Sequence, residues 1–168
     1  IKVYTNTKDT DVLFGGDGTA ILDFGDGSIE LVGYVENKVD ASLAADGSIA
    51  FVTYTTTHAY SEGQYTISYR EPNRNEGVLN MNGSVNTEFY IETTVYFGST
   101  IEECNQPPQL NVPPVDKGCK GIAWTHNPGA YDPDGDATLR YELVVPFQGR
   151  GRQVNGYRDP VTFSVSNE

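Results

Sequence analysis

Residues 19–27 read Thr-Ala-Ile-Leu-Asp-Phe-Gly-Asp-Gly, a short apolar run that ends in an Asp-Gly step. Another Gly-Asp-Gly step, residues 16–18, comes directly before it. Such steps favour tight hairpin turns, because glycine tolerates a positive φ. A short apolar run between two turn signals is typical of a β-strand. The stretch therefore predicts a strand, Thr19–Phe24, that leads through a tight turn into a second strand, Ser28–Val35.

The other strong segments of the first hundred residues are also predicted to be strands. Tyr and Ile alternate with other residues from position 64 to position 69, which is the two-residue period of a strand. No segment combines a 3.6-residue apolar stripe with helix caps, and residues 39–45 would give at most one or two turns. The chain is predicted to be all-β and antiparallel, with further strands at Ile49–Tyr60, Gln64–Tyr69 and Asn86–Phe97.

The charge of the chain limits its partners. It has 11 basic and 23 acidic residues, a formal net charge of −12 over 168 residues. This charge disfavours nucleic acid and anionic membranes. It fits a solvated extracellular surface, and it also fits cation binding. No run approaches the roughly 18 apolar residues of a membrane helix, so membrane insertion is not expected. No signal-peptide pattern is visible, and the chain starts in a strand-like run, as a mature or excised fragment would.

A proline-rich stretch predicts a division into two modules. Four prolines fall within residues 107–114, which makes this segment stiff and extended. We expect one module over residues 1–103 and a second over residues 104–168. The second has only about 65 residues, whereas a β-sandwich needs about 100, so we expect it to be truncated. Its predicted strands are Gly121–Thr125, Thr138–Pro146 and Val161–Val165.

The two cysteines, Cys104 and Cys119, flank this junction. In an exported protein they are expected to form a disulfide around a loop of about 15 residues, worth roughly 3 kcal/mol. The alternative is a pair of reduced, buried thiols. No histidine stands at the spacing of a zinc site beside them.

Three short motifs carry a family resemblance. They are Leu22-Asp23-Phe24-Gly25-Asp26-Gly27, His58-Ala59-Tyr60 and Gly63-Gln64-Tyr65. Together they resemble the polycystic-kidney-disease (PKD) type of immunoglobulin-like domain. This resemblance implies an immunoglobulin-like β-sandwich over residues 1–103, with His58 bonding to a turn as a structural residue. The family usually has a tryptophan before the turn, where this chain has Ile21 or Leu22.

A second resemblance covers the later part of the chain. Pro72-Asn73-Arg74-Asn75, Ser84-Val85-Asn86, Pro107-Pro108 and the run from Thr125 to Asp136 look like large secreted surface proteins of gliding bacteria, which use type IX secretion. Asp132-Pro133-Asp134-Gly135-Asp136 is also similar to cadherin-like modules. The resemblance implies a secreted or cell-surface location and a second immunoglobulin-like module. It implies as partners the other domains of the same polypeptide and a surface protein or polysaccharide.

The aspartate run is the candidate metal site. Asp132, Asp134 and Asp136 alternate, so in an extended segment their carboxylates share one face and repel one another unless a cation lies between them. Calcium takes six to eight oxygen ligands, and the cadherin resemblance adds Asn105, with Glu103 and Glu102 beside it, as junction ligands. The alternative is a solvated turn whose aspartates accept backbone N–H groups. Turn chemistry is favoured over metal binding for a second group, Asp17, Asp23 and Asp26.

No catalytic motif is present around the two histidines, His58 and His126. A glycosidase-type carboxylate pair stays open at this point. The sequence therefore predicts a non-catalytic extracellular structural or adhesion module, with Ca²⁺ as its candidate ligand. The alternative is a carbohydrate-binding accessory module of a secreted polysaccharide-active protein. Trp124 is expected in the core of the second module rather than on a glycan platform.

Overall fold

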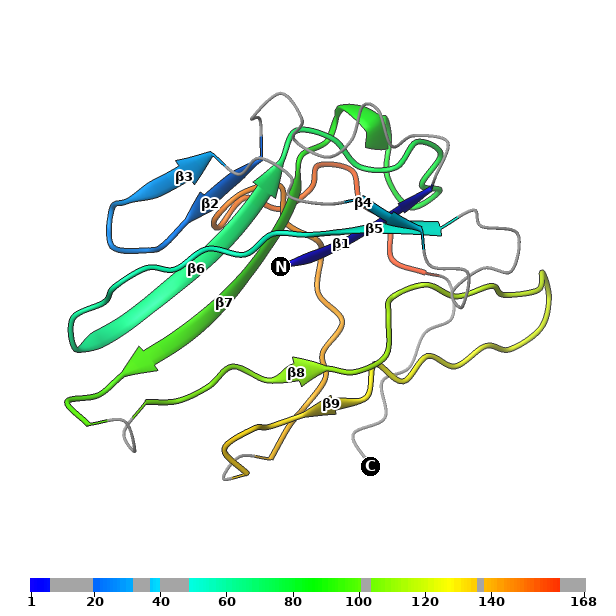
Figure 1. Cartoon of the computed structure of the whole chain (residues 1–168). Helices are drawn as coiled ribbons and strands as arrows, with labels where there is room; N and C mark the ends of the chain where they lie inside the picture. Colours follow the sequence, from blue (N-terminus) through cyan, green and yellow to red (C-terminus); the bar gives the residue numbers. More distant parts are fainter. Residues whose placement is uncertain (7–19, 32–36, 40–48, 101–103, 136–137, 161–168) are drawn as a thin grey trace.

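The computed structural model describes residues 1–6, 20–31, 37–39, 49–100, 104–135 and 138–160 (Figure 1). All of its sheets are antiparallel, and none of the described residues lies in an α-helix. The predicted all-β class is confirmed. The elements are β1 (Lys2–Asn6), β2 (Ile21–Asp23), β3 (Ile29–Leu31), β4 (Asn37–Val39), β5 (Ile49–Thr53), β6 (Gly63–Glu71), a 3₁₀ turn (Ser84–Asn86), β7 (Phe89–Phe97), β8 (Gln109–Leu110) and β9 (Ala130–Tyr131).

Two sheets make up the first part of the chain. One has the strand order β1-β5-β4 and the other the order β3-β2-β6-β7, while β8 and β9 pair separately. The long strands β6 and β7 pair in register from Gly63 opposite Phe97 to Glu71 opposite Phe89. Figure 1 shows these two strands side by side, with β1 and β5 crossing them at an angle. The arrangement is a sandwich-like fold of two layers.

The core lies between these layers. Leu22 of β2 is opposite Tyr69 of β6, and both are buried. Phe24 and Tyr54 complete the cluster with Ala20, and Val3 of β1 and Ile67 of β6 pack against it. Burying each large side chain of this kind contributes roughly 1.5–3 kcal/mol. The alternation predicted for residues 64–69 thus places Tyr69, only 1% exposed, at the centre of the core.

One carboxylate is buried beside this core. The Tyr69 hydroxyl donates a hydrogen bond to the carboxylate of Glu71, and both residues are buried. Burial raises the pKa of Glu71, while the hydrogen bond from Tyr69 opposes that shift. Burial and the neighbouring carboxylate raise the pKa of Tyr69 as well. The tyrosine therefore stays protonated and serves as the donor of this interior pair.

The outer face of the second sheet is also covered. Ser68 and Tyr90 point away from the core because neighbouring strand residues alternate between faces, yet they are only 6% and 8% exposed. Residues 146–158 return to this sheet, and Arg150 Nη2 donates to Thr66 O at 2.7 Å. Arg74 Nη2 donates to Phe147 O at 2.6 Å, and Arg152 pairs with the Glu88 carboxylate. Residues 146–158 thus pack against this sheet (Figure 1, orange).

Residues 104–145 have no comparable core. None of the described residues from 104 to 148 is buried, and Trp124 is 54% exposed. The expected core position of Trp124 is wrong, and so are the strands expected at Gly121–Thr125 and Thr138–Pro146, which pair with no other strand. Among the described residues of this part, β8 and β9 form the paired strands, and no second sheet covers these apolar side chains. The predicted boundary after residue 103 stays a prediction, and Val161–Val165 and most of residues 39–45 lie outside the described residues.

The expected disulfide does not form between Cys104 and Cys119. Both are described, and both are free thiols. The Sγ of Cys104 instead faces the carbonyl oxygen of Thr100 at 3.5 Å. The stabilisation expected from this cross-link is therefore absent.

Replacing Arg74 tests the attachment of residues 146–158. Arg74 donates to Glu88 O at 3.1 Å and to Phe147 O, and its guanidinium lies 5.4 Å from the Phe89 ring centroid. We expect Arg74→Leu to lower the free energy of unfolding by about 2–4 kcal/mol, because charged hydrogen bonds and a cation–π contact are lost. Amide exchange at Ser68 and Tyr90 should also accelerate, measured by NMR. The exposed Arg140→Leu is the control, and equal effects of the two changes would contradict the assignment.

Candidate functional site

The turn after β2 is built by two aspartates. Asp23 Oδ1 accepts the Gly25 N–H at 2.8 Å, and Asp26 Oδ1 accepts the Ser28 N–H at 2.9 Å. Phe24 N donates to Ser28 O at 3.1 Å, which closes the loop between β2 and β3. The turn chemistry predicted for Asp23 and Asp26 is confirmed. Asp17, the third member of that predicted group, lies outside the described residues.

Glycine is required in this turn for two reasons. Gly25 has φ +82°, a left-handed conformation that side chains disfavour. A Cβ at Gly25 would also lie 2.5 Å from Thr66 O and 2.9 Å from Thr66 N of β6. The backbone of the turn therefore lies directly on the backbone of β6.

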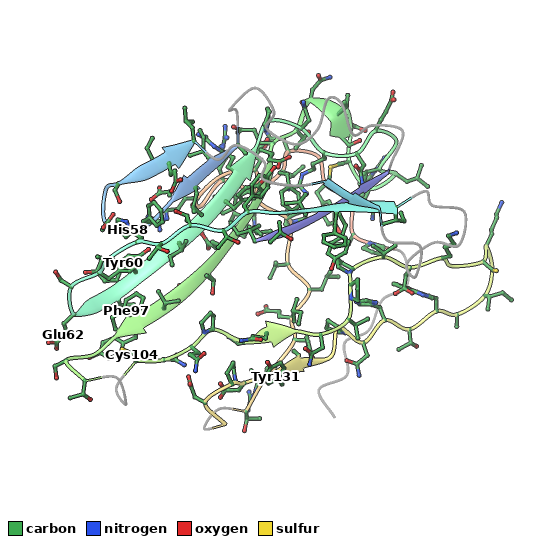
Figure 2. The ribbon with its side chains drawn as sticks, viewed as in Figure 1. His58, Tyr60, Glu62, Phe97, Cys104 and Tyr131 are labelled. Carbon is green, nitrogen blue, oxygen red and sulfur yellow. The ribbon has the colours of Figure 1, made fainter. Side chains whose placement is uncertain are left out.

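His58 holds the turn from the opposite side. Its Nε2 lies 2.7 Å from Asp26 Oδ2, and its ring stacks on Phe24 with centroids 4.0 Å apart. Tyr60 contacts the His58 ring edge-on and donates its hydroxyl to Phe24 O at 3.0 Å. Figure 2 shows His58 and Tyr60 on the segment between β5 and β6. The rings of Tyr60 and Phe97 of β7 stack with centroids 4.6 Å apart. The predicted bond between His58 and a turn is confirmed.

Ser28, His58 and Asp26 do not form a nucleophile relay. In such a relay one imidazole nitrogen faces the serine and the other faces the carboxylate. Here the same atom, His58 Nε2, faces both Asp26 and Ser28 Oγ, the latter at 3.4 Å. The Ser28 hydroxyl donates directly to Asp26 Oδ1 at 2.5 Å. The three side chains act together to fix a turn.

A pocket of about 370 Å³ lies beside this turn. It opens between the two sheets, where the segment from Tyr54 to Tyr60 crosses from β5 to β6. Tyr54 is buried at its base, whereas Thr55 and Thr56 are exposed at its rim. Sequence analysis gave no sign of this pocket. Its lining consists of Ile1, Leu22, Phe24, Tyr54, Thr55, Thr56, His58, Tyr60 and Ile67.

The predicted junction site brings Asn105 and Asp134 together. Asn105 Nδ2 donates to Asp134 Oδ2 at 3.1 Å, and the Gln106 N–H donates to the same oxygen at 2.6 Å. Gln106 Nε2 donates to Asp134 Oδ1 at 3.0 Å. These N–H donors, with the backbone hydrogen bond first, lower the pKa of Asp134. Sequence analysis missed Gln106, since no motif marks it.

The aspartate run is bent rather than extended where it is described. Asp134 N donates to Asp132 Oδ1 at 3.1 Å, and Gly135 has φ +73°. In this part of the run, the carboxylates of Asp132 and Asp134 therefore accept backbone N–H groups, as expected for a solvated turn. Asp136 and Glu103 lie outside the described residues. Within the described ranges no group of three or more His, Cys, Asp or Glu residues is placed to hold a metal ion.

Trp124 forms a small exposed cluster with His126. The two rings stack with centroids 5.8 Å apart, and His126 Nδ1 bonds to the Asp116 carboxylate. Tyr131 on β9 is also exposed, and its hydroxyl donates to Gln109 Oε1 at 2.7 Å. Figure 2 places Tyr131 on β9, apart from His58 and Tyr60. This part of the chain therefore presents aromatic surface to solvent.

No protein-family model matches this chain, and comparisons with curated proteins and with solved structures give no match either. The search for membrane spans, made over the described residues, found no helix of the length and hydropathy needed to cross a bilayer.

The link between Asp26 and His58 predicts a pH dependence. Hydrogen bonds from Ser28 and His58 hold the pKa of Asp26 well below its usual range. A lowered pKa in the folded state stabilises the fold above the unfolded pKa of about 4, and this contribution is lost as the pH falls further. We expect Asp26→Asn to lower the Tm at pH 7 and to flatten its decrease between pH 4 and pH 2, measured by thermal denaturation.

The exposed Asp159→Asn makes the same change of charge away from the turn and should leave the wild-type profile intact. A Tm profile of Asp26→Asn that runs parallel to the wild-type profile down to pH 2 would count against the role of Asp26.

Proposed function

We propose that this chain is a non-catalytic structural or adhesion module of a larger secreted or cell-surface protein. The observation that carries the proposal is the junction around Asp134, where the segment after β7 is fastened to the turn after β9. Asn105 and Gln106 supply three N–H donors to one carboxylate, and Asn105 N also donates to Tyr96 O at 3.0 Å. A junction fixed at several points suits a spacer that holds its neighbours at a set distance.

Two further features support this proposal. The turn at Asp23–Ser28 with His58 and Tyr60 has residues of the PKD resemblance, and Asp23, Asp26, His58 and Tyr60 all make hydrogen bonds or ion pairs within or onto this turn. The net charge of −12 fits a solvated extracellular surface. We accordingly propose a PKD-like first module and a cadherin-like second segment.

Calcium is part of the proposal as a stabilising ion at the junction. Asp132 and Asp134 are the described carboxylates that would hold it, with oxygen from the Asn105 side chain. In the present arrangement both oxygens of Asp134 accept N–H groups, so an ion has to displace some of these donors. Bound calcium would neutralise the carboxylates and stiffen the junction.

Calorimetry with and without calcium tests this proposal. Extracellular calcium sites bind at about 0.1–1 mM, so 10 mM calcium should stabilise the fold by about 1.4–2.7 kcal/mol. We expect a rise in Tm that EDTA reverses and that Asp134→Asn abolishes, while Asp159→Asn retains it. An unchanged transition at 10 mM calcium would contradict the calcium part and leave a junction held by N–H donors alone.

Carbohydrate binding is the second candidate function, and the exposed Trp124 favours it. Indole and phenol rings on a surface offer flat apolar faces with polar edges. Trp124 is the only tryptophan, so its fluorescence reports directly on this surface. A saturable change in that fluorescence on addition of a soluble polysaccharide would favour the accessory-module function over the structural one.

A further inference from the structure

The pocket beside the β2–β3 turn has the size and lining of a small binding site. Its volume of about 370 Å³ lies within the range of about 300–1,000 Å³ that is typical of ligand sites. Phe24, Tyr54 and Tyr60 supply aromatic rings, while Leu22 and Ile67 supply aliphatic surface. The structural proposal above leaves this pocket unused.

Carboxylates lie around the pocket and bond to its lining. Asp26 Oδ2 lies 2.7 Å from His58 Nε2, and Glu30 Oε2 accepts the Thr56 hydroxyl at 2.8 Å. Burial raises the pKa of Tyr60, and the charges of Asp26 and Asp23 raise it further. The negative charges of Asp23 and Asp26 are therefore close enough to affect Tyr60, which lines the pocket.

The pocket lining also includes a positive group. The α-ammonium group of Ile1 donates to Tyr54 O at 2.9 Å, and Tyr54 N donates back to Ile1 O at 2.9 Å. This ammonium group carries one positive charge, and it already donates a hydrogen bond to a backbone carbonyl. Among the described side chains beside the pocket, the three carboxylates of Asp23, Asp26 and Glu30 outnumber this ammonium and His58, which pairs with Asp26.

We propose that this pocket binds a cationic group on an apolar stem, namely a lysine side chain presented by a basic segment of a protein partner. Aromatic faces attract a cation within about 6 Å of the ring centroid, and the effect grows when the cation is desolvated. The aliphatic stem of lysine packs along apolar surface while its charged end stays near the carboxylates. This inference adds a partner class to the proposed function and does not depend on calcium.

NMR titration of the full chain tests the inference with three probes. The first is a blocked Gly-Lys-Gly peptide, the second is its norleucine counterpart, and the third is n-butylammonium. We expect the lysine peptide to shift the resonances of Thr56, His58 and Tyr60 saturably, and the uncharged norleucine peptide to bind at least tenfold more weakly. Equal binding of these two peptides, or no saturable shift with either, would overturn the cation assignment. Binding of n-butylammonium as tight as that of the lysine peptide would overturn the assignment to a peptide partner.

Glu30→Gln is the matched variant, because glutamine keeps an acceptor for Thr56 and removes the charge. We expect it to weaken the lysine peptide about threefold, as for an exposed charge pair, and to leave the norleucine peptide unchanged. Glu76→Gln, at an exposed position outside the pocket lining, should change neither. Equal affinity of wild type and Glu30→Gln for the lysine peptide would contradict the inference. Failure of these tests leaves the structural role intact, because none of them probes the Asp134 junction.

Discussion

The contact between the turn at Gly25 and the backbone of β6 is the constraint on which the two packed sheets depend. With no room for a Cβ at Gly25, the turn can lie against Thr66 only as glycine. This close approach brings Phe24 into the core next to Leu22 and Tyr69. The same turn carries Asp26 into reach of His58. The β2–β6 pairing, the core and the segment from Tyr54 to Tyr60 thus all depend on the close approach that Gly25 permits.

The segment from Tyr54 to Tyr60, which crosses from β5 to β6, depends on this contact. His58 packs on Phe24 and Tyr60 on His58, and the residues before them, Tyr54, Thr55 and Thr56, line a pocket beside the turn. The acidic side chains that make the turn lie at the edge of that pocket. The aspartates that form the turn, Asp23 and Asp26, therefore also supply negative charge near the pocket. The hydrogen bonds at Asp134 are separate from this turn. They fix the segment after β7 through N–H donors of Asn105 and Gln106.

The sequence predicted the all-β class, β6 and the β2–β3 turn, because their signals are local. Alternation in residues 64–69 and the Asp-Gly step after Phe24 depend only on neighbouring residues, and β6 and the β2–β3 turn appear where they were expected. The second half was predicted poorly because apolar strands and exposed apolar segments have the same composition. Whether Trp124 is buried depends on a facing sheet, and the described residues supply none there. Gln106 and Arg150 act on residues 28 and 84 positions away, a distance at which local patterns carry no information.

The most direct measurement is a comparison of Gly25→Ala with Gly27→Ala by chemical denaturation. Both glycines have positive φ, so each alanine incurs about 1–2 kcal/mol of backbone strain. A Cβ at Gly27 meets open space, whereas at Gly25 it meets the backbone of Thr66. We expect the free energy of unfolding to fall by at least about 2 kcal/mol more for Gly25→Ala than for Gly27→Ala, or Gly25→Ala not to fold at all. The reason is that the backbone of Thr66 cannot move aside as a flexible side chain can. Equal losses for the two variants would contradict this expectation.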